Sequence, residues 1–141
     1  TYVGLYDRPA FANELGADFF ISVHNNSNDY PTPNGTEVHY YSKVDAEGHT
    51  EEDLYGIGSK TVAAAVQKEM LTYVGAYDRK IKSSPALAVL NKTVMPAIVV
   101  EGAFMSNAND LSLIRSEDYA KKYAFACAKG IILSMNEAFG N

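Results

Sequence analysis

Two titratable residues in this 141-residue sequence each stand at the end of an apolar run. Residues 97–100 follow Pro96 and lead into Glu101, and residues 18–23 lead into His24. A short continuous apolar run is typical of a strand that is buried on both faces. Because ligands in open α/β sheets bind beyond the carboxyl ends of the strands, we expect His24 and Glu101 to lie side by side on one rim of a sheet.

The chemistry open to these two residues is proton transfer and metal binding. A carboxylate that is partly desolvated at a strand end can have a raised pKa and can move protons near neutral pH. The alternatives are a helix-capping or salt-bridged Glu101 and a structural, hydrogen-bonded His24. The sequence holds no His-x-x-x-His or Cys-x-x-Cys pair, and we expect His39 and His49 on the surface, so the residues alone leave a metal site incomplete.

The elements that must position this pair alternate between strand and helix along the chain. The predicted strands are 18–23, 35–41, 86–90 and 97–101, and the predicted helices are 2–15, 51–73, 107–115 and a last helix that opens at Ser116. The start of the first helix is open, and Asp7 is a candidate N-cap because Pro9 fits only a first turn. This alternation predicts an α/β three-layer sandwich, with a mostly parallel twisted sheet and helices on both faces. The core face predicted for the last helix consists of Ala120, Ala124, Cys127, Ile131 and Met135.

Two segments have a polar pattern. The alternation in 35–41 indicates a strand with one wetter face, which we expect near an edge of the sheet. The basic segment 78–82 is expected to be a solvated loop, and the alternative is a loop that contacts substrate.

Composition excludes several classes of function. A net charge of −5 argues against nucleic acid or an anionic membrane as the main partner, and no apolar run approaches the length of a membrane span. The single cysteine, Cys127, excludes an internal disulfide framework and is expected to be a small buried hydrophobe. No nucleophile elbow, phosphate loop or dinucleotide fingerprint is present.

Several motifs resemble one known family. Residues 17–26, Ala-Asp-Phe-Phe-Ile-Ser-Val-His-Asn-Asn, resemble the ADLFISIHAN segment of the zinc-dependent N-acetylmuramoyl-L-alanine amidases, the amidase type 3 family of peptidoglycan hydrolases. Residues 96–107 resemble its PAVLVELGFLSN segment, 35–41 its GxExYY strand, and Arg79 with 81–82 its RGIK loop. Weaker matches are Leu5, Arg8, Ala12, Asn13 and residues 87–90. The chain is therefore identified as a member of that family.

The resemblance implies a zinc-assisted hydrolysis of the amide between N-acetylmuramic acid and the L-alanine of the stem peptide. His24 matches one of three protein ligands of Zn²⁺, Glu101 matches the catalytic glutamate, and Asn26 is a candidate to brace His24. Peptidoglycan is then the partner, and the location is extracytoplasmic, secreted or cell-wall associated.

The resemblance also implies an incomplete domain. The other two zinc ligands of the family lie upstream of the segment that matches Thr1, so we expect residues 1–141 to be the C-terminal portion of one amidase catalytic domain and to be inactive alone. The alternatives are a non-catalytic cell-wall-binding or regulatory remnant of the same fold, and an unrelated α/β module that binds a small molecule. A portion that lacks the strand carrying the first of these ligands would expose an edge of the sheet, and we expect such an edge to allow self-association.

Overall fold

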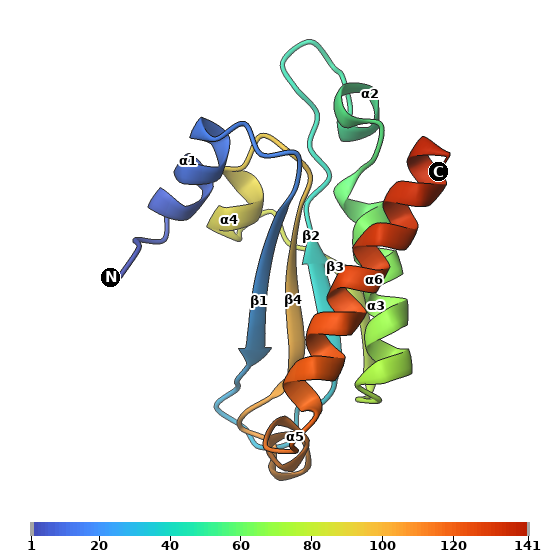
Figure 1. The fold of residues 1–141 in the computed structure, drawn as a ribbon. Helices are drawn as coiled ribbons and strands as arrows, with labels where there is room; N and C mark the ends of the chain where they lie inside the picture. Colours follow the sequence, from blue (N-terminus) through green and yellow to red (C-terminus); the bar gives the residue numbers. More distant parts are fainter. Residues whose placement is uncertain (1, 141) are drawn as a thin grey trace.

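The structure, a computed structural model, describes residues 2–140. Its centre is a four-stranded sheet in the order β1-β4-β2-β3, with helices on both faces (Figure 1). The strands are β1 (Phe20–Asn26), β2 (Thr36–Tyr40), β3 (Asp78–Ser83) and β4 (Ala97–Phe104). The predicted α/β fold is confirmed. Among residues 2–140, none of the helices combines the length and apolar character that crossing a bilayer requires.

The sheet is mixed. β1 pairs with β4 and β2 with β3 in parallel, whereas β2 runs antiparallel to β4. The connection 27–35 between β1 and β2 contains no helix, and a parallel return would need a longer crossover. β2 therefore runs opposite to β1. In the sheet, β2 lies between β4 and β3, so the predicted position of 35–41 near an edge is wrong.

The basic segment predicted to be a loop is the strand β3. Its pairing with β2 shifts register, because Thr36 pairs with Asp78 but Val38 pairs with Ile81. Within this bulge Lys80 has a φ of 70°, in the left-handed region. Side chains alternate between faces along a regular strand, so the extra residue lets Arg79 and Lys82, three positions apart, reach the same carboxylate.

The helices form two layers around the sheet. α1 (Asp7–Glu14) and α4 (Ala88–Asn91) lie on one face, and α3 (Ser59–Tyr73) and α6 (Tyr119–Phe139) cover the other (Figure 1). The two remaining helices are α2 (Glu51–Tyr55) and α5 (Ala108–Ile114).

Four of these helices differ from the sequence prediction. The helix predicted for 51–73 is broken into α2 and α3, because Gly56 ends α2 with a φ of 74° and Gly58 precedes α3. The strand predicted for 86–90 is α4, since a short apolar run does not distinguish a strand from a buried helical turn. The first helix, α1, begins at Asp7 and not at residue 2, and its N-cap is Tyr6 and not the candidate Asp7.

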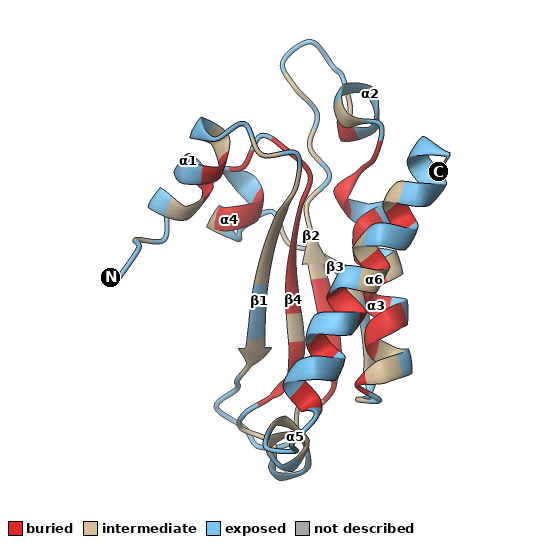
Figure 2. Cartoon of the chain, viewed as in Figure 1, coloured by how far each residue is buried: buried red, intermediate tan, exposed pale blue. Residues whose placement is uncertain are grey.

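The main core lies between the sheet and the α3–α6 layer (Figure 2). Val38 and Val100 of the sheet pack there against the buried side chains of α3. Cys127 is buried in this core, as expected, but Ala120 and Ala124 are exposed. α6 instead buries the face that carries Tyr119, Tyr123, Ala126, Cys127, Gly130 and Ser134. Gly130 allows this face of α6 to pack closely against α3, since a Cβ there would lie 2.6 Å from the Cα of Val66.

Candidate active site

His24 and Glu101 lie directly opposite each other in the parallel pairing of β1 and β4. Both line a cleft of about 310 Å³ on the face of the sheet that carries α1 and α4. The rest of the cleft is lined by Leu5, Tyr6, Arg8, Ser22, Ala86, Leu87, Ala88, Val89 and Val99. The structure therefore brings together the two residues that the sequence predicts to share one rim.

His24 is exposed and is oriented by its own strand. Its Nε2 lies 2.7 Å from Ser22 Oγ, and Ser22 occupies the same face two residues earlier. The predicted brace from Asn26 is wrong, because Asn26 Nδ2 donates to Glu37 Oε1 at 3.2 Å. The register between β1 and β4 shifts after His24, and this irregularity accompanies the turn of Asn26 toward β2.

Two tyrosines of α6 hold the backbone around His24 from the opposite face. Tyr123 Oη lies 2.6 Å from the carbonyl oxygen of His24 and 2.8 Å from that of Val100. Tyr119 Oη donates to the side-chain oxygen of Asn25. Gly102 allows this approach, since a Cβ there would lie 2.6 Å from Cε1 of Tyr123. Sequence reasoning missed both tyrosines, although their spacing of four on a helix is a usable signal.

Glu101 is half-buried, and within residues 2–140 its Oε2 is buried without a hydrogen-bond partner. Burial raises the pKa of Glu101 to about 7, with a further rise from Glu37 and an opposing effect of His39. A carboxyl group with this pKa exchanges protons readily near neutrality.

Sequence reasoning also missed Glu37, which lies opposite Glu101 in the pairing of β2 with β4. Its Oε2 accepts from Arg79 Nε at 2.6 Å and Lys82 Nζ at 2.5 Å, and its Oε1 lies 3.1 Å from His39 Nε2. Burial alone would raise the pKa of Glu37, but the hydrogen bonds from His39, Lys82 and Arg79 outweigh it and hold the pKa far below its usual range. Glu37 therefore stays ionised.

His39 is predicted to lie on the surface, but the cluster around Glu37 encloses it. Its side chain is only 17% exposed, and its Nδ1 lies 2.7 Å from Ser84 Oγ. The alternation of 35–41 is correct, and it places His39 and Glu37 on the same face of β2.

A second group of possible metal ligands lies in the loop after β2. Oxygen and nitrogen atoms of Asp45, Glu47 and His49 lie within 4.8 Å of one another, and all three residues are exposed. Because β2 runs antiparallel to β4, this loop lies at the opposite end of the sheet from the carboxyl end of β1 (Figure 1). His49 is on the surface, as predicted, and this group is separate from the cleft.

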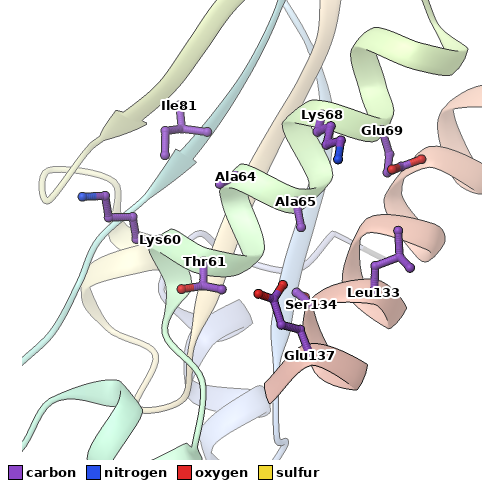
Figure 3. Close-up of a pocket in the computed structure, with 10 residues that line it drawn as sticks. All are labelled: Lys60, Thr61, Ala64, Ala65, Lys68, Glu69, Ile81, Leu133, Ser134 and Glu137. Carbon is purple, nitrogen blue, oxygen red and sulfur yellow. The ribbon is translucent and has the colours of Figure 1, made fainter. Parts of the chain in front are cut away.

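Another hollow, a groove of about 640 Å³, runs between α3 and α6 on the far face of the sheet (Figure 3). It is lined by Lys60, Thr61, Ala64, Ala65, Lys68, Glu69, Ile81, Leu133, Ser134 and Glu137. No histidine or cysteine is among these residues, and the sheet separates them from Glu101, so the groove is not part of the candidate site.

Comparison with known proteins decides the family. The family model described as N-acetylmuramoyl-L-alanine amidase, type 3, matches residues 1–133. The chain belongs to this amidase family. The alternative of an unrelated α/β module is therefore wrong.

Relatives of this amidase chain come from several bacteria and a phage. It is 33% identical over 132 residues to the N-acetylmuramoyl-L-alanine amidase LytC of Bacillus subtilis, covering 94% of this chain and 24% of LytC. It is 33% identical over 136 residues to the endolysin of Bacillus phage SPP1, covering 96% of this chain and 47% of the endolysin. The chain thus spans about a quarter to a half of these relatives.

Solved structures agree with the amidase fold. The N-acetylmuramoyl-L-alanine amidase of Clostridium difficile 630 superposes with a TM-score of 0.82 at 30% identity, covering 96% of this chain and 67% of that one. The catalytic domain of CwlV from Bacillus (Paenibacillus) polymyxa var. colistinus gives a TM-score of 0.80 at 29% identity, covering 96% and 68%.

The donors in the cleft match a zinc site only in part. His24 offers an imidazole nitrogen, and Glu101 offers a buried oxygen that has no hydrogen-bond partner within residues 2–140. A catalytic zinc takes three protein ligands, and His24 is the one imidazole that lines the cleft among the described residues. The cleft therefore offers fewer imidazole ligands than the three protein ligands that a catalytic zinc takes.

Proposed function

We propose that this chain is the C-terminal portion of a zinc-dependent amidase catalytic domain that hydrolyses the amide between N-acetylmuramic acid and the L-alanine of the stem peptide. The observation that carries the proposal is the cleft in which Glu101 lies opposite His24, with its Oε2 unpaired among the described residues. Family membership supports the reaction class. We further propose that peptidoglycan is the partner and that the protein acts outside the cytoplasm, where the cell wall lies.

His24 and Glu101 have separate roles in this proposal. When bound, zinc supplies a Lewis acid that polarises the amide carbonyl and acidifies the attacking water. His24 is one ligand, and its contact with Ser22 fixes the orientation of the imidazole. Glu101 takes a proton from the water at its unpaired Oε2 and then delivers it to the leaving amine.

Burial is the main cause of the raised pKa of Glu101, and the charge of Glu37 adds to it. The two carboxylates lie opposite each other, but three cationic or hydrogen-bonding neighbours hold Glu37 ionised. Surroundings that separate the pKa values of two carboxyl groups assign one as the proton carrier and the other as a fixed charge. Glu101 is therefore the group that titrates in the working range.

A chimera tests the reaction. The portion of the CwlV catalytic domain that this chain matches is replaced by residues 1–141, and release of L-alanyl peptides from purified muropeptides is measured with zinc. We expect hydrolysis by the chimera and a loss of about 10²–10⁴-fold in rate for Glu101→Gln. Glu117→Gln, an exposed charge before α6, is the matched control and should leave the rate unchanged. An active Glu101→Gln chimera would contradict the role of Glu101.

The isolated chain tests the zinc proposal. We expect the 141 residues, stripped with chelator and given excess zinc, to cleave muropeptides poorly, because the cleft contains one imidazole. Robust hydrolysis would show that these residues complete the site. An inactive chimera that still binds peptidoglycan would support the alternative of a non-catalytic wall-binding remnant.

A further inference from the structure

The cleft contains a cation that the reaction does not use. Arg8 lies in the first turn of α1, is half-buried, and lines the cleft together with His24 and Glu101. It also lines an adjoining hollow with Phe11, Phe20 and Ser22, so its side chain lies between two open spaces beside the floor of the site.

The guanidinium of Arg8 is largely unpartnered. Its Nε–H donates to the carbonyl oxygen of Val3 at 3.3 Å, and within residues 2–140 no carboxylate lies within ion-pair distance of it. A guanidinium has five N–H donors in a fixed fork, so most of those of Arg8 remain available to a ligand.

The contrast with Arg79 is informative. Arg79 and Lys82 both form ion pairs with the buried carboxylate of Glu37. Arg8 has no such counter-charge, and Glu101 is the one carboxylate that lines the cleft among the described residues. The cleft therefore presents an uncompensated fork of N–H donors on its α1 side, and such a fork binds a carboxylate in bidentate fashion.

The walls of the cleft favour a peptide over a simple anion. Leu5 and Tyr6 stand beside Arg8, and Leu87 and Val89 form the α4 side. A volume of about 310 Å³ is at the small end of ligand sites, so a charge bound at Arg8 lies close to the floor.

We propose that Arg8 binds a carboxylate of the peptide ligand, close to the amide held over His24 and Glu101. This inference rests on the proposed function, since it names the charge of the peptide that the same cleft accepts. Arg8 would then favour acidic peptides over their amidated counterparts.

A binding experiment on the 141-residue chain tests this without turnover. The probes are N-acetyl-L-alanyl-glutamate and the same dipeptide with both carboxyl groups converted to amides, titrated by NMR and calorimetry in chelator. We expect the acid to bind about tenfold more tightly than the amide, with a shift of the Arg8 Nε–H resonance for the acid alone. Arg8→Gln should remove this preference and leave amide binding unchanged.

Arg115→Gln is the matched control, because it removes the same charge from an exposed position at the end of α5 and should keep the preference. If Arg8→Gln does not fold, Arg8→Lys replaces it, and we expect the preference to fall about threefold because an ammonium lacks the fork. The inference is overturned if wild type does not discriminate between the probes or binds neither. It is also overturned if the preference survives in the folded Arg8 variant.

The two proposals fail separately. An inactive chimera with an Arg8-dependent acid preference would remove the hydrolase proposal and keep the carboxylate site. An active chimera without that preference would do the reverse.

Discussion

Glu37 and Glu101 show how neighbouring groups divide the labour of two similar side chains. They lie opposite each other on β2 and β4, yet the pKa of Glu37 falls and that of Glu101 rises. Burial raises the pKa of Glu101, whose Oε2 has no hydrogen-bond partner among the described residues. Glu37 is also buried, but Arg79, Lys82 and His39 all bond to it and lower its pKa. A buried carboxyl group without a partner lowers the stability of the fold when it is ionised, and its raised pKa suits it to proton transfer.

The first prediction concerns this cost. The pKa of Glu101 rises from 4.5 to about 7 on folding, so ionisation is harder in the folded chain. Stability is therefore lost as pH rises from about 4.5 through 7. We expect Glu101→Gln to raise the Tm relative to wild type at pH 8, and the difference to vanish near pH 4.5. Thermal melts in chelator measure it, with Glu117→Gln as the control, and an equal Tm at pH 8 would refute the prediction.

The second prediction concerns Glu37, whose folded pKa is depressed. Its contribution to stability is present above the unfolded pKa and is lost as pH falls below it. Glu37→Gln should lower the free energy of unfolding at pH 7 by about 2 kcal/mol, which is less than for a fully buried pair because Arg79 and Lys82 are 29% and 39% exposed. Urea titrations at pH 7 and pH 3.5 measure this. A loss that persists undiminished at pH 3.5 would contradict the ionic origin.

The strand β3 turns a sequence of surface character into part of the site. Its bulge at Lys80 brings two cations onto one carboxylate, at the cost of a left-handed lysine. The RGIK motif of the family has glycine at this position, which adopts a positive φ without strain. The backbone at position 80 thus has the conformation that glycine of the motif adopts easily, but the residue there is lysine.

The third prediction follows from that mismatch. An L-residue in the left-handed region costs about 1 kcal/mol, so Lys80→Gly should raise the Tm by about 4 °C. Lys80→Ala is the control, since it removes the same charge and keeps the Cβ, and it should not raise the Tm. If the alanine variant is stabilised as much as the glycine variant, the gain comes from charge and not from the backbone.

At the scale of the whole molecule, the edge of the sheet formed by β1 is open and lies beside an apolar groove. Within residues 2–140, β1 pairs with β4 alone, and Val23 on this strand is 56% exposed. A groove of about 700 Å³ separates β1 from α6 and is lined by apolar side chains that include Ile21, Ile114 and Ile131. An open strand beside an apolar groove can pair with a further strand.

The fourth prediction is that the isolated chain associates with a second copy through this edge. Light scattering coupled to size exclusion should show a mass that rises with concentration, and Val23→Lys should abolish the rise because it places a charge on the free edge. Val44→Lys, at an exposed position in the loop after β2, is the control and should leave the association intact. A monomer at all concentrations would refute the prediction.

Much of this architecture could be predicted from local pattern. The apolar runs before His24 and Glu101 identified β1 and β4, and the alternation of 35–41 identified β2 and its two faces. The helices at 107–115 and after Ser116 were also placed well. These predictions hold because a strand that is buried on both faces has a continuous apolar sequence, and a helix start has capping residues, so the local sequence is enough to identify either.

The order of the strands, the β3 bulge and the Glu37 cluster were decided by tertiary structure. Glu37 and its partners Arg79 and Lys82 are separated by 42 and 45 positions, and each looks like surface charge within its own segment. Likewise, the buried face of α6 depends on the close approach that Gly130 allows to α3. Burial of a charge or the rotation of a helix depends on what a distant element supplies, and hydrophobic periodicity does not record that element.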